Sequence, residues 1–430
     1  MVTILQAMVI AAQIIIYGLI RDLMPRKYIP VSLGLVAAGL GLSTVMAPLF
    51  GDWLVDHHGW QGVLWFLAIY TLVMTPLVVL VFVKSPLRVG NRVDLAGAVL
   101  VSAGVLLTLL YLNKGQDWGW GSPTSLACLL GGLAALVALF VVESRIDSPL
   151  MDMKLLAQPK VALVLLMTFF GVGITAFHGY ALGSMSRTPD IEGMKSVVAQ
   201  EATARAQQAG VNLPPSAVQI AFDPGYSYGS GFSMTAFIVH LGMWVGVATL
   251  VFGLIGGWLA HRHGTRIPAI IGLTVLAILG VCFAWISDGH YSWERLLVST
   301  LLFGVGFGFF YAGLANLLVE AVPAGQQRVG VGVLAVAQNM GAAAALAAVT
   351  AVLQHHAVTA NIAVMGRNAT KVFPQVHTDN GLAIGFGIVT VGTLVALVIA
   401  ISIRGVRAPG TEEGTRRTAQ PSASERNSYT

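Results

Sequence analysis

Long apolar stretches alternate with short polar connections along the whole of this 430-residue chain. A helix of about 20 residues is long enough to cross the hydrocarbon core of a membrane. The pattern therefore predicts an all-α integral membrane protein with eleven spanning helices, and this odd number places the two chain ends on opposite sides of the membrane. The expected spans are residues 2–20, 30–51, 61–83, 95–113, 124–142, 161–182, 233–260, 267–287, 296–319, 329–354 and 381–403.

The composition leaves no room for a large soluble domain. Charged residues make up 10% of the chain and apolar residues 56%, with a mean hydropathy of +0.78, whereas soluble domains carry about 25% charged residues. The two longest interruptions, residues 183–232 and 355–380, are long enough only for a small cap. Within the first we expect a short surface helix at residues 196–208, followed by Gly210 and Pro214.

The net charge of +5 comes from Lys and Arg side chains that lie in the connections and the C-terminal tail. One side of the predicted membrane carries 17 of the 24 basic residues and the other carries 7. Because cytoplasmic loops are rich in Lys and Arg, the richer side, which includes the C-terminus, is predicted to be cytoplasmic. The N-terminus is then outside. The basic charge reflects membrane orientation, and we expect no nucleic-acid partner.

The second span carries small residues at Gly34, Ser43, Ala47 and Gly51, and the last three repeat every four residues along one helix face. Such spacing lets two membrane helices approach closely, since lipid supplies no hydrophobic drive for helix packing. Pro48 removes a backbone donor and permits a bend. Tight packing without any functional role is the alternative.

The seventh span ends in the sequence from Gly257 to Arg266, which contains His261, Arg262 and Gly264. A glycine permits a sharp turn after a helix, and basic residues there can meet helix C-termini and acidic partners. Contacts of this kind would stabilise one conformation of a bundle and break in another.

Both motifs resemble those of the major facilitator superfamily. The spacing in the second span is similar to the antiporter motif of that family, with Ser43 and Ala47 as small replacements and Asp52 in place of the final glycine. The segment from Gly257 is similar to the family's cytoplasmic loop motif, with His261 in place of its acidic residue.

Residues 94–122 and 148–156 resemble the additional helix pair and the linker of the 14-helix drug:proton antiporter branch. The resemblance implies that the first three helices of that branch are absent and that residues 1–20 correspond to its fourth helix, where only Gln6 of the family pattern remains. It divides the chain as follows: residues 1–83 as the rest of the N-terminal bundle, 84–160 as the helix pair and linker, 161–404 as a six-helix C-terminal bundle with outer loop 183–232, and 405–430 as a disordered cytoplasmic tail.

Polar side chains inside membrane helices are costly and are candidates for function. A facilitator-type cavity lies between the two bundles, and several residues are placed to line it, although each could instead form a hydrogen bond between helices. The candidates for the substrate cavity are Gln13, His178, His240, Trp244, Tyr311, Asn316, Gln338 and Asn339.

Acidic residues are absent from the middle of every predicted span, because Asp52, Asp56, Asp94, Glu143 and Glu320 lie at span ends. The resemblance implies proton coupling through an acid in the first family helix, which this chain lacks. Titration of His178 or His240 is the alternative.

Other motifs carry no catalytic prediction. The segment from Gly225 to Gly229 spells Gly-x-Ser-x-Gly, but a hydrolase needs that motif on an α/β sheet, and here it precedes a membrane helix. The pairs His57-His58 and His355-His356 lie in connections, where solvated histidines are the simpler interpretation than a metal site. We therefore expect that the protein is not an enzyme and that it binds no cofactor.

The sequence thus predicts a secondary transporter of the inner (plasma) membrane that exports small amphipathic or drug-like compounds by alternating access. Its expected partners are the substrate, protons, the lipid bilayer and periplasmic adaptor proteins. A solute permease of another substrate and a truncated membrane protein without transport activity are the alternatives. An integral membrane enzyme is less favoured because no convergent catalytic set is present.

Overall fold

The computed structural model describes residues 20, 24–25, 28–81, 95–143, 145, 158–208, 214, 218–322, 327–364 and 367–403. Within these residues, eight helices are long and apolar enough to cross a membrane, and two shorter apolar helices lie at Val31–Ser43 and Ala96–Leu112. These ten positions match ten of the expected spans, so that prediction is confirmed for them. The expected span 2–20, apart from residue 20, and the tail 405–430 lie outside the described residues.

Helix α2 (Ile29–Val81) covers the second and third expected spans and breaks at Gly59, where φ is 66°. A positive φ suits glycine because it has no Cβ. The part before Gly59 packs against α10 and α12. The part after it is largely exposed, with Trp65 70% and Leu80 84% accessible.

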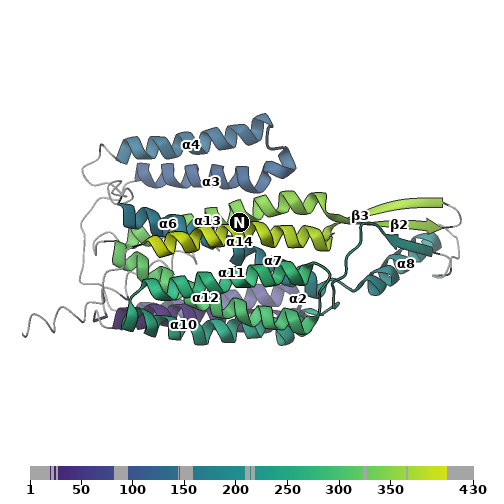
Figure 1. The fold of residues 1–430 in the computed structure, drawn as a ribbon, viewed down its shortest axis with the longest axis horizontal. Coiled ribbons are helices and arrows are strands. Elements are labelled where there is room, and N and C mark those ends of the chain that lie inside the picture. The colour runs from purple at the N-terminus through teal and green to yellow at the C-terminus, as the bar shows by residue number, and fades with distance from the viewer. Residues whose placement is uncertain are drawn as a thin grey trace, which may run out of the picture.

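Helices α3 (Leu95–Trp118) and α4 (Pro123–Glu143) form an antiparallel hairpin. The turn between them contains Gly119 with φ 84°. A Cβ on Gly132 would lie 3.0 Å from the backbone nitrogen of Thr108, so the two helices touch nearly backbone to backbone. The hairpin lies at the side of the molecule next to α13 (Figure 1).

All six expected spans of the C-terminal bundle are present as helices. The first is divided into α6 (Pro159–Gly171) and α7 (Gly173–Arg187), and the second runs through α9 (Met234–Phe237), the π-helical turn η3 (Ile238–Gly242) and α10 (Met243–His263). The others are α11 (Arg266–Ser287), α12 (Trp293–Ala321), α13 (Gln327–His355) and α14 (Asp379–Ser402). The helices run roughly side by side along the long axis (Figure 1).

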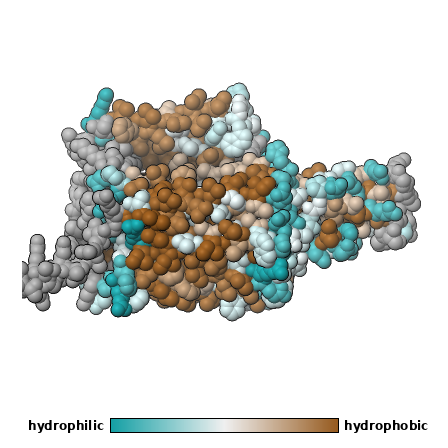
Figure 2. Space-filling model, in the orientation of Figure 1, coloured by the Kyte–Doolittle hydropathy of each residue, from teal (hydrophilic) through white to brown (hydrophobic). Residues whose placement is uncertain are grey.

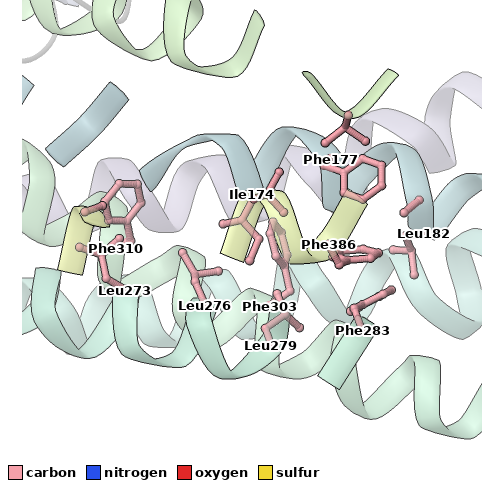
Figure 3. Packing of buried hydrophobic residues seen from close by; sticks show 14 of the residues in the cluster. Ile174, Phe177, Leu182, Leu273, Leu276, Leu279, Phe283, Phe303, Phe310 and Phe386 are labelled. Atoms are coloured by element: carbon pink, nitrogen blue, oxygen red, sulfur yellow. The ribbon is translucent and has the colours of Figure 1, made fainter. Parts of the chain in front are cut away.

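The interior of this bundle is aromatic and aliphatic (Figure 3). Phe386 of α14 lies between Phe177 of α7 and Phe283 of α11, with ring centroids 4.7 Å and 4.6 Å away. Each of these three side chains is fully buried. Such rings fix the mutual placement of three helices that are distant in the sequence.

The two long connections form one cap at the same end of the bundle, on the right in Figure 1. Helix α8 (Ile191–Gln208) confirms the expected surface helix and begins earlier than predicted. Three antiparallel strands, β1 (Val218–Phe222), β2 (Ala357–Val364) and β3 (Arg367–His377), form a sheet of order β1-β2-β3. The sheet is a departure from an entirely helical fold, and it lies outside the predicted spans.

The cap has its own apolar contact surface. Ile220, Phe222 and Phe373 are half-buried and pack against a cluster that includes Met194 and Val198 of α8. These strand residues alternate with exposed ones, as in a sheet with one covered face. Figure 2 shows the brown hydrophobic surface along the bundle, with teal polar residues concentrated at its two ends and on the cap.

Candidate functional site

The contact between α2 and the C-terminal bundle depends on glycine. A Cβ on Gly34 would lie 2.8 Å from Cα of Gly257, and a Cβ on Gly41 would lie 2.6 Å from the carbonyl oxygen of Gly246. Ala38, between them on the same helix face, is 3% exposed. The two helix backbones therefore touch over two turns, and any larger side chain at either glycine would separate them.

The same close approach continues from α10 to α12. A Cβ on Gly308 would lie 2.8 Å from the backbone nitrogen of Gly253, and one on Gly304 would lie 2.7 Å from the carbonyl oxygen of Val245. Helices α2, α10 and α12 thus form a tightly packed layer that joins the N-terminal part of the chain to the C-terminal bundle.

The other residues of the predicted small-residue motif lie away from this contact. Ser43 is exposed and donates its hydroxyl to the Gly39 carbonyl at 3.0 Å. Ala47 is exposed, and a Cβ on Gly51 would meet nothing within 4 Å. The side chain of Pro48 is outside what the structure describes. Gly41 was missed because the motif placed Ser43 on the contact face.

The segment after Gly257 links three helix ends at the end of the bundle opposite the cap. Gly264 has φ 102° and ends α10. Arg266, which begins α11, donates from Nε to the carbonyl of Ala400 at 3.1 Å, and its guanidinium also donates to the carbonyl of Ile401. Because both acceptors belong to the last turn of α14, the arginine satisfies helix-end carbonyls and complements the helix dipole.

The remaining residues of this motif are on the surface. Arg262 lies over the ring of Trp258, with its Cζ 5.5 Å from the centroid. His261 is exposed. The neighbouring Thr265 donates to a carboxylate oxygen of Glu320 at the end of α12. The motif therefore ties α10 and α11 to α12 and α14.

His178 is not in a cavity. It is 1% exposed, and its ring stacks face to face on Phe303 with centroids 3.7 Å apart, while Phe283 meets it edge-on at 5.0 Å. Its Nε2 has no hydrogen-bond partner among the described residues. His178 is thus packed as an aromatic ring inside the C-terminal bundle.

Asn316 and Tyr311 lie on α12. Asn316 is 3% exposed and donates its amide to the Ala312 carbonyl at 2.7 Å, one turn earlier in the same helix. Tyr311 is half-buried and stacks on Phe307 with centroids 4.3 Å apart. The Asn316 amide therefore forms its hydrogen bond within its own helix, and in this conformation it is not directed at a ligand.

Four other candidates lie at exposed or partly exposed positions. His240 sits in the π-helical turn η3, donates from Nδ1 to the Ala236 carbonyl at 2.8 Å, and contacts Phe232 and Trp293. The side chains of Trp244 and Asn339 are exposed, and that of Gln338 is half-buried. Gln13 lies outside the described residues.

The candidates therefore fall into two groups. His178 and Asn316 are inside the C-terminal bundle, whereas His240, Trp244 and Asn339 project from the surfaces of α9–α10 and α13. A π-turn in an α-helix is often found at a functional position, which singles out His240.

The Gly-x-Ser-x-Gly segment has a structural role in the cap. The Ser227 backbone donates to a carboxylate oxygen of Asp379 at 3.0 Å, and Tyr226 and Tyr228 are buried. Gly229 has φ 115°, and a Cβ there would lie 2.5 Å from the Pro189 carbonyl oxygen. Across the described ranges, no group of three or more His, Cys, Asp or Glu residues is arranged to hold a metal ion.

Sequence comparison adds independent information. The family model described as Major Facilitator Superfamily matches residues 1–198. The chain is 26% identical over 285 residues to the tetracenomycin C resistance and export protein of Streptomyces glaucescens, covering 60% of this chain and 48% of that protein. It is 26% identical over 345 residues to a triacylglyceride transporter of Mycolicibacterium smegmatis, covering 74% and 52%.

A third relative is a probable actinorhodin transporter of Streptomyces coelicolor, 25% identical over 346 residues, with 75% of this chain and 51% of that protein covered. The chain thus spans about half the length of the curated relatives it matches. Together with the membrane-length apolar helices, these matches indicate a membrane transporter that is similar to members of the major facilitator superfamily.

Proposed function

We propose that this chain acts in the export of small amphipathic compounds by alternating access. The observation that carries this proposal is the glycine-packed layer of α2, α10 and α12, which joins the two parts of the chain through backbone contacts. Rocking of one bundle against another at such an interface is the mechanism of many secondary transporters. The names of two relatives, a tetracenomycin C resistance and export protein and a probable actinorhodin transporter, support the export of a small compound.

The division of the chain into residues 1–83, 84–160, 161–404 and 405–430 is part of the proposal. It is supported by the α3–α4 hairpin, which packs beside α13 as a separate pair, and by the six-helix bundle that follows it. The candidate substrate residues are those whose side chains are exposed or partly exposed at the surface of the bundle: His240, Trp244, Gln338 and Asn339. Protons are the proposed coupling ion in a longer form of the protein.

The proposed orientation places the cap outside the inner membrane and the opposite end in the cytoplasm. Both long connections meet in the cap, where the basic residues are few, while Arg262 and Arg266 lie at the opposite end. That distribution agrees with the enrichment of Lys and Arg on the cytoplasmic side. Periplasmic adaptor proteins are a proposed class of partner for the exposed cap.

Efflux from cells tests this function. An efflux-deficient bacterium expressing the chain is preloaded with ethidium, and loss of fluorescence is followed with and without an uncoupler that removes the proton gradient. The proposal expects efflux that stops on uncoupling and in His240→Ala or Asn339→Ala. Normal membrane insertion without efflux would support the non-transporting alternative, and flux that ignores the uncoupler would support a permease.

A further inference from the structure

The cap is joined to the bundle at His377, the last residue of β3 and two residues before α14. Its side chain is 4% exposed. The imidazole Nε2 lies 2.7 Å from the hydroxyl of Tyr180 on α7, which makes a direct hydrogen bond between the cap and the outer half of a membrane span.

The backbone of His377 is fixed from a second direction. Tyr228 donates its hydroxyl to the His377 carbonyl at 2.7 Å and accepts from the His377 backbone N–H at 3.2 Å. Tyr228 is itself 1% exposed. The imidazole is therefore held in one position, and its contact with Tyr180 depends on how α7 meets the cap.

The second nitrogen of this imidazole, Nδ1, is buried and has no hydrogen-bond partner among the described residues. Burial lowers the pKa of His377; the Leu353 carbonyl at the end of α13 opposes this, and nearby His356 lowers it further. The other titratable groups that face it are Tyr180 from α7, Tyr228 from the loop before α9, and, next to Tyr228, Asp379 of α14.

Helix α7 is a separate segment of its span. The break at Val172 falls between Gly171 and Gly173, and the Val172 carbonyl accepts the hydroxyl of Thr175 at 2.7 Å. A Cβ on Gly173 would lie 2.6 Å from Cβ of Ala345 on α13. The cap-bound half of the span thus begins at a defined joint inside the bundle.

We propose that the His377–Tyr180 contact is an acid-sensitive latch that docks the cap on α7 when the imidazole is neutral and releases it when the imidazole is protonated. A neutral imidazole has one donor nitrogen and one acceptor nitrogen, and the Tyr180 hydroxyl is the hydrogen-bond partner of Nε2. A protonated imidazole has two N–H donors. In the docked cap Nδ1 makes no hydrogen bond to a described residue, and the Leu353 carbonyl offsets only part of the cost of burying the charge. Leaving a buried charged donor unpaired is unfavourable, so protonation favours the released cap.

The direction of the pH dependence of docking follows from the linkage between proton binding and docking. The docked form binds a proton less readily than the released form, in which the imidazole is solvated and titrates near 6.5. Docking is therefore complete above that pH and weakens as the pH falls below it. Between pH 7.5 and 5.5, the ratio of released to docked cap should rise by up to about tenfold. This inference concerns the cap alone and holds whether or not the chain transports ethidium.

Spin-label distances in lipid nanodiscs test the latch. The native Cys128 and Cys282 are replaced by Ser, and labels are attached at Ala204 on the exposed face of α8 and at Val391 on the exposed face of α14. The distribution of distances between the two labels is measured by pulsed electron–electron double resonance at pH 7.5 and 5.5. We expect a single narrow distribution at pH 7.5 and a second, broader population at pH 5.5.

Four variants separate the latch from other effects. His377→Gln, which retains hydrogen-bonding groups but does not titrate, should stay docked at both pH values. Tyr180→Phe should show the released population already at pH 7.5. His290→Gln, an exposed imidazole stacked on Trp285, and His356→Gln should keep the wild-type response.

Several results would overturn the proposal. These are an unchanged wild-type distribution between the two pH values, a full response in His377→Gln, or a Tyr180→Phe protein as docked as the wild type at pH 7.5. A response that disappears in His356→Gln but persists in His377→Gln would assign the titration to the neighbouring imidazole and would equally overturn it.

Discussion

Gly34 of α2 and Gly257 of α10 lie so close that a Cβ on Gly34 would be 2.8 Å from Cα of Gly257. Real Cβ atoms do not approach backbone atoms this closely, so position 34 can hold only glycine without a shift of one helix. Helix α2 belongs to the N-terminal part of the chain and α10 to the C-terminal bundle. This contact therefore lies in the interface at which the two parts would move in the proposed alternating-access mechanism.

Gly34→Ala should separate the two helices and lower the free energy of unfolding by about 1–3 kcal/mol, the usual cost of overpacking. Unfolding in mixed detergent micelles, followed by circular dichroism, measures this. Gly39→Ala on the same helix is the matched control, because a Cβ on Gly39 would meet nothing within 4 Å. Equal effects of the two substitutions would contradict the packing that we describe.

Arg266 should contribute to stability through the end of α14. Arg266→Gln removes the cationic donor from the carbonyls of Ala400 and Ile401, and a charge at a helix C-terminus contributes about 0.3–1 kcal/mol. We expect a loss of about 1 kcal/mol in the same unfolding measurement. Arg262→Gln, which removes only a surface contact with Trp258, should cost less; a larger cost there would argue against the helix-end role of Arg266.

His178 should tolerate replacement by an apolar ring. Its Nε2 is unpartnered and its ring stacks on Phe303, so His178→Phe removes an unsatisfied polar atom and keeps the stacking. We expect stability within about 1 kcal/mol of the wild type, whereas His178→Ala should cost about 3 kcal/mol through the cavity that it leaves. Retained stability with lost ethidium efflux in His178→Phe would instead assign this imidazole to transport.

The two asparagines should behave oppositely. Asn316 is buried inside α12 and Asn339 is exposed on α13. Asn316→Ala should lower the free energy of unfolding by about 1–2 kcal/mol because it leaves a cavity and removes a buried hydrogen bond. Asn339→Ala should leave stability unchanged and reduce efflux. Thermal unfolding and ethidium efflux on the same preparations give both values.

The ion pairs of the cap should respond to pH in a more acidic range than His377, because they involve the carboxylate of Glu201. Lys371 of β3 donates to Glu201 of α8 at 2.6 Å, and Arg205 does so at 2.7 Å. The hydrogen bond from Lys371 is the main cause of the lowered pKa of Glu201. A lowered carboxyl pKa gives stability that is present above the ordinary value near 4.3 and is lost as the pH falls through the lowered one.

Glu201→Gln should therefore loosen α8 from β3 equally at pH 5.5 and 7.5 and leave the response between these values intact. The effect should be small because both side chains are more than a third exposed. The distance between labels on α8 and β3 measures it. Loss of the response between pH 5.5 and 7.5 in Glu201→Gln would mean that this carboxylate, and not His377, controls the cap.

The membrane helices could be predicted from sequence because each span must satisfy its own backbone hydrogen bonds in lipid, which requires a long apolar helix. The span 381–403, for example, is found as α14 at Asp379–Ser402. The surface helix was predictable from its polar composition and from Gly210 and Pro214 after it. The outlines of the cap followed from the lengths of residues 183–232 and 355–380.

The face that each helix buries could not be predicted in the same way. Lipid and the bundle interior are both apolar, so the sequence carries little amphipathic pattern to distinguish them. Ser43 and Gly41 are both small residues, yet of the two Gly41 is the one packed on α10. The repeat of Gly253 and Gly257, and that of Gly304 and Gly308, would have pointed to α10 and α12 as the partners.

The sequence by itself determined the class of protein, the position of the described spans and the motifs that resemble a transporter family, because those properties depend on local composition and spacing. The tertiary structure decided that His178 is buried while His240 is exposed, that β1 pairs with β2 in the cap, and that His377 meets Tyr180. These contacts join residues far apart in the chain, and only the packing of the helices brings them together.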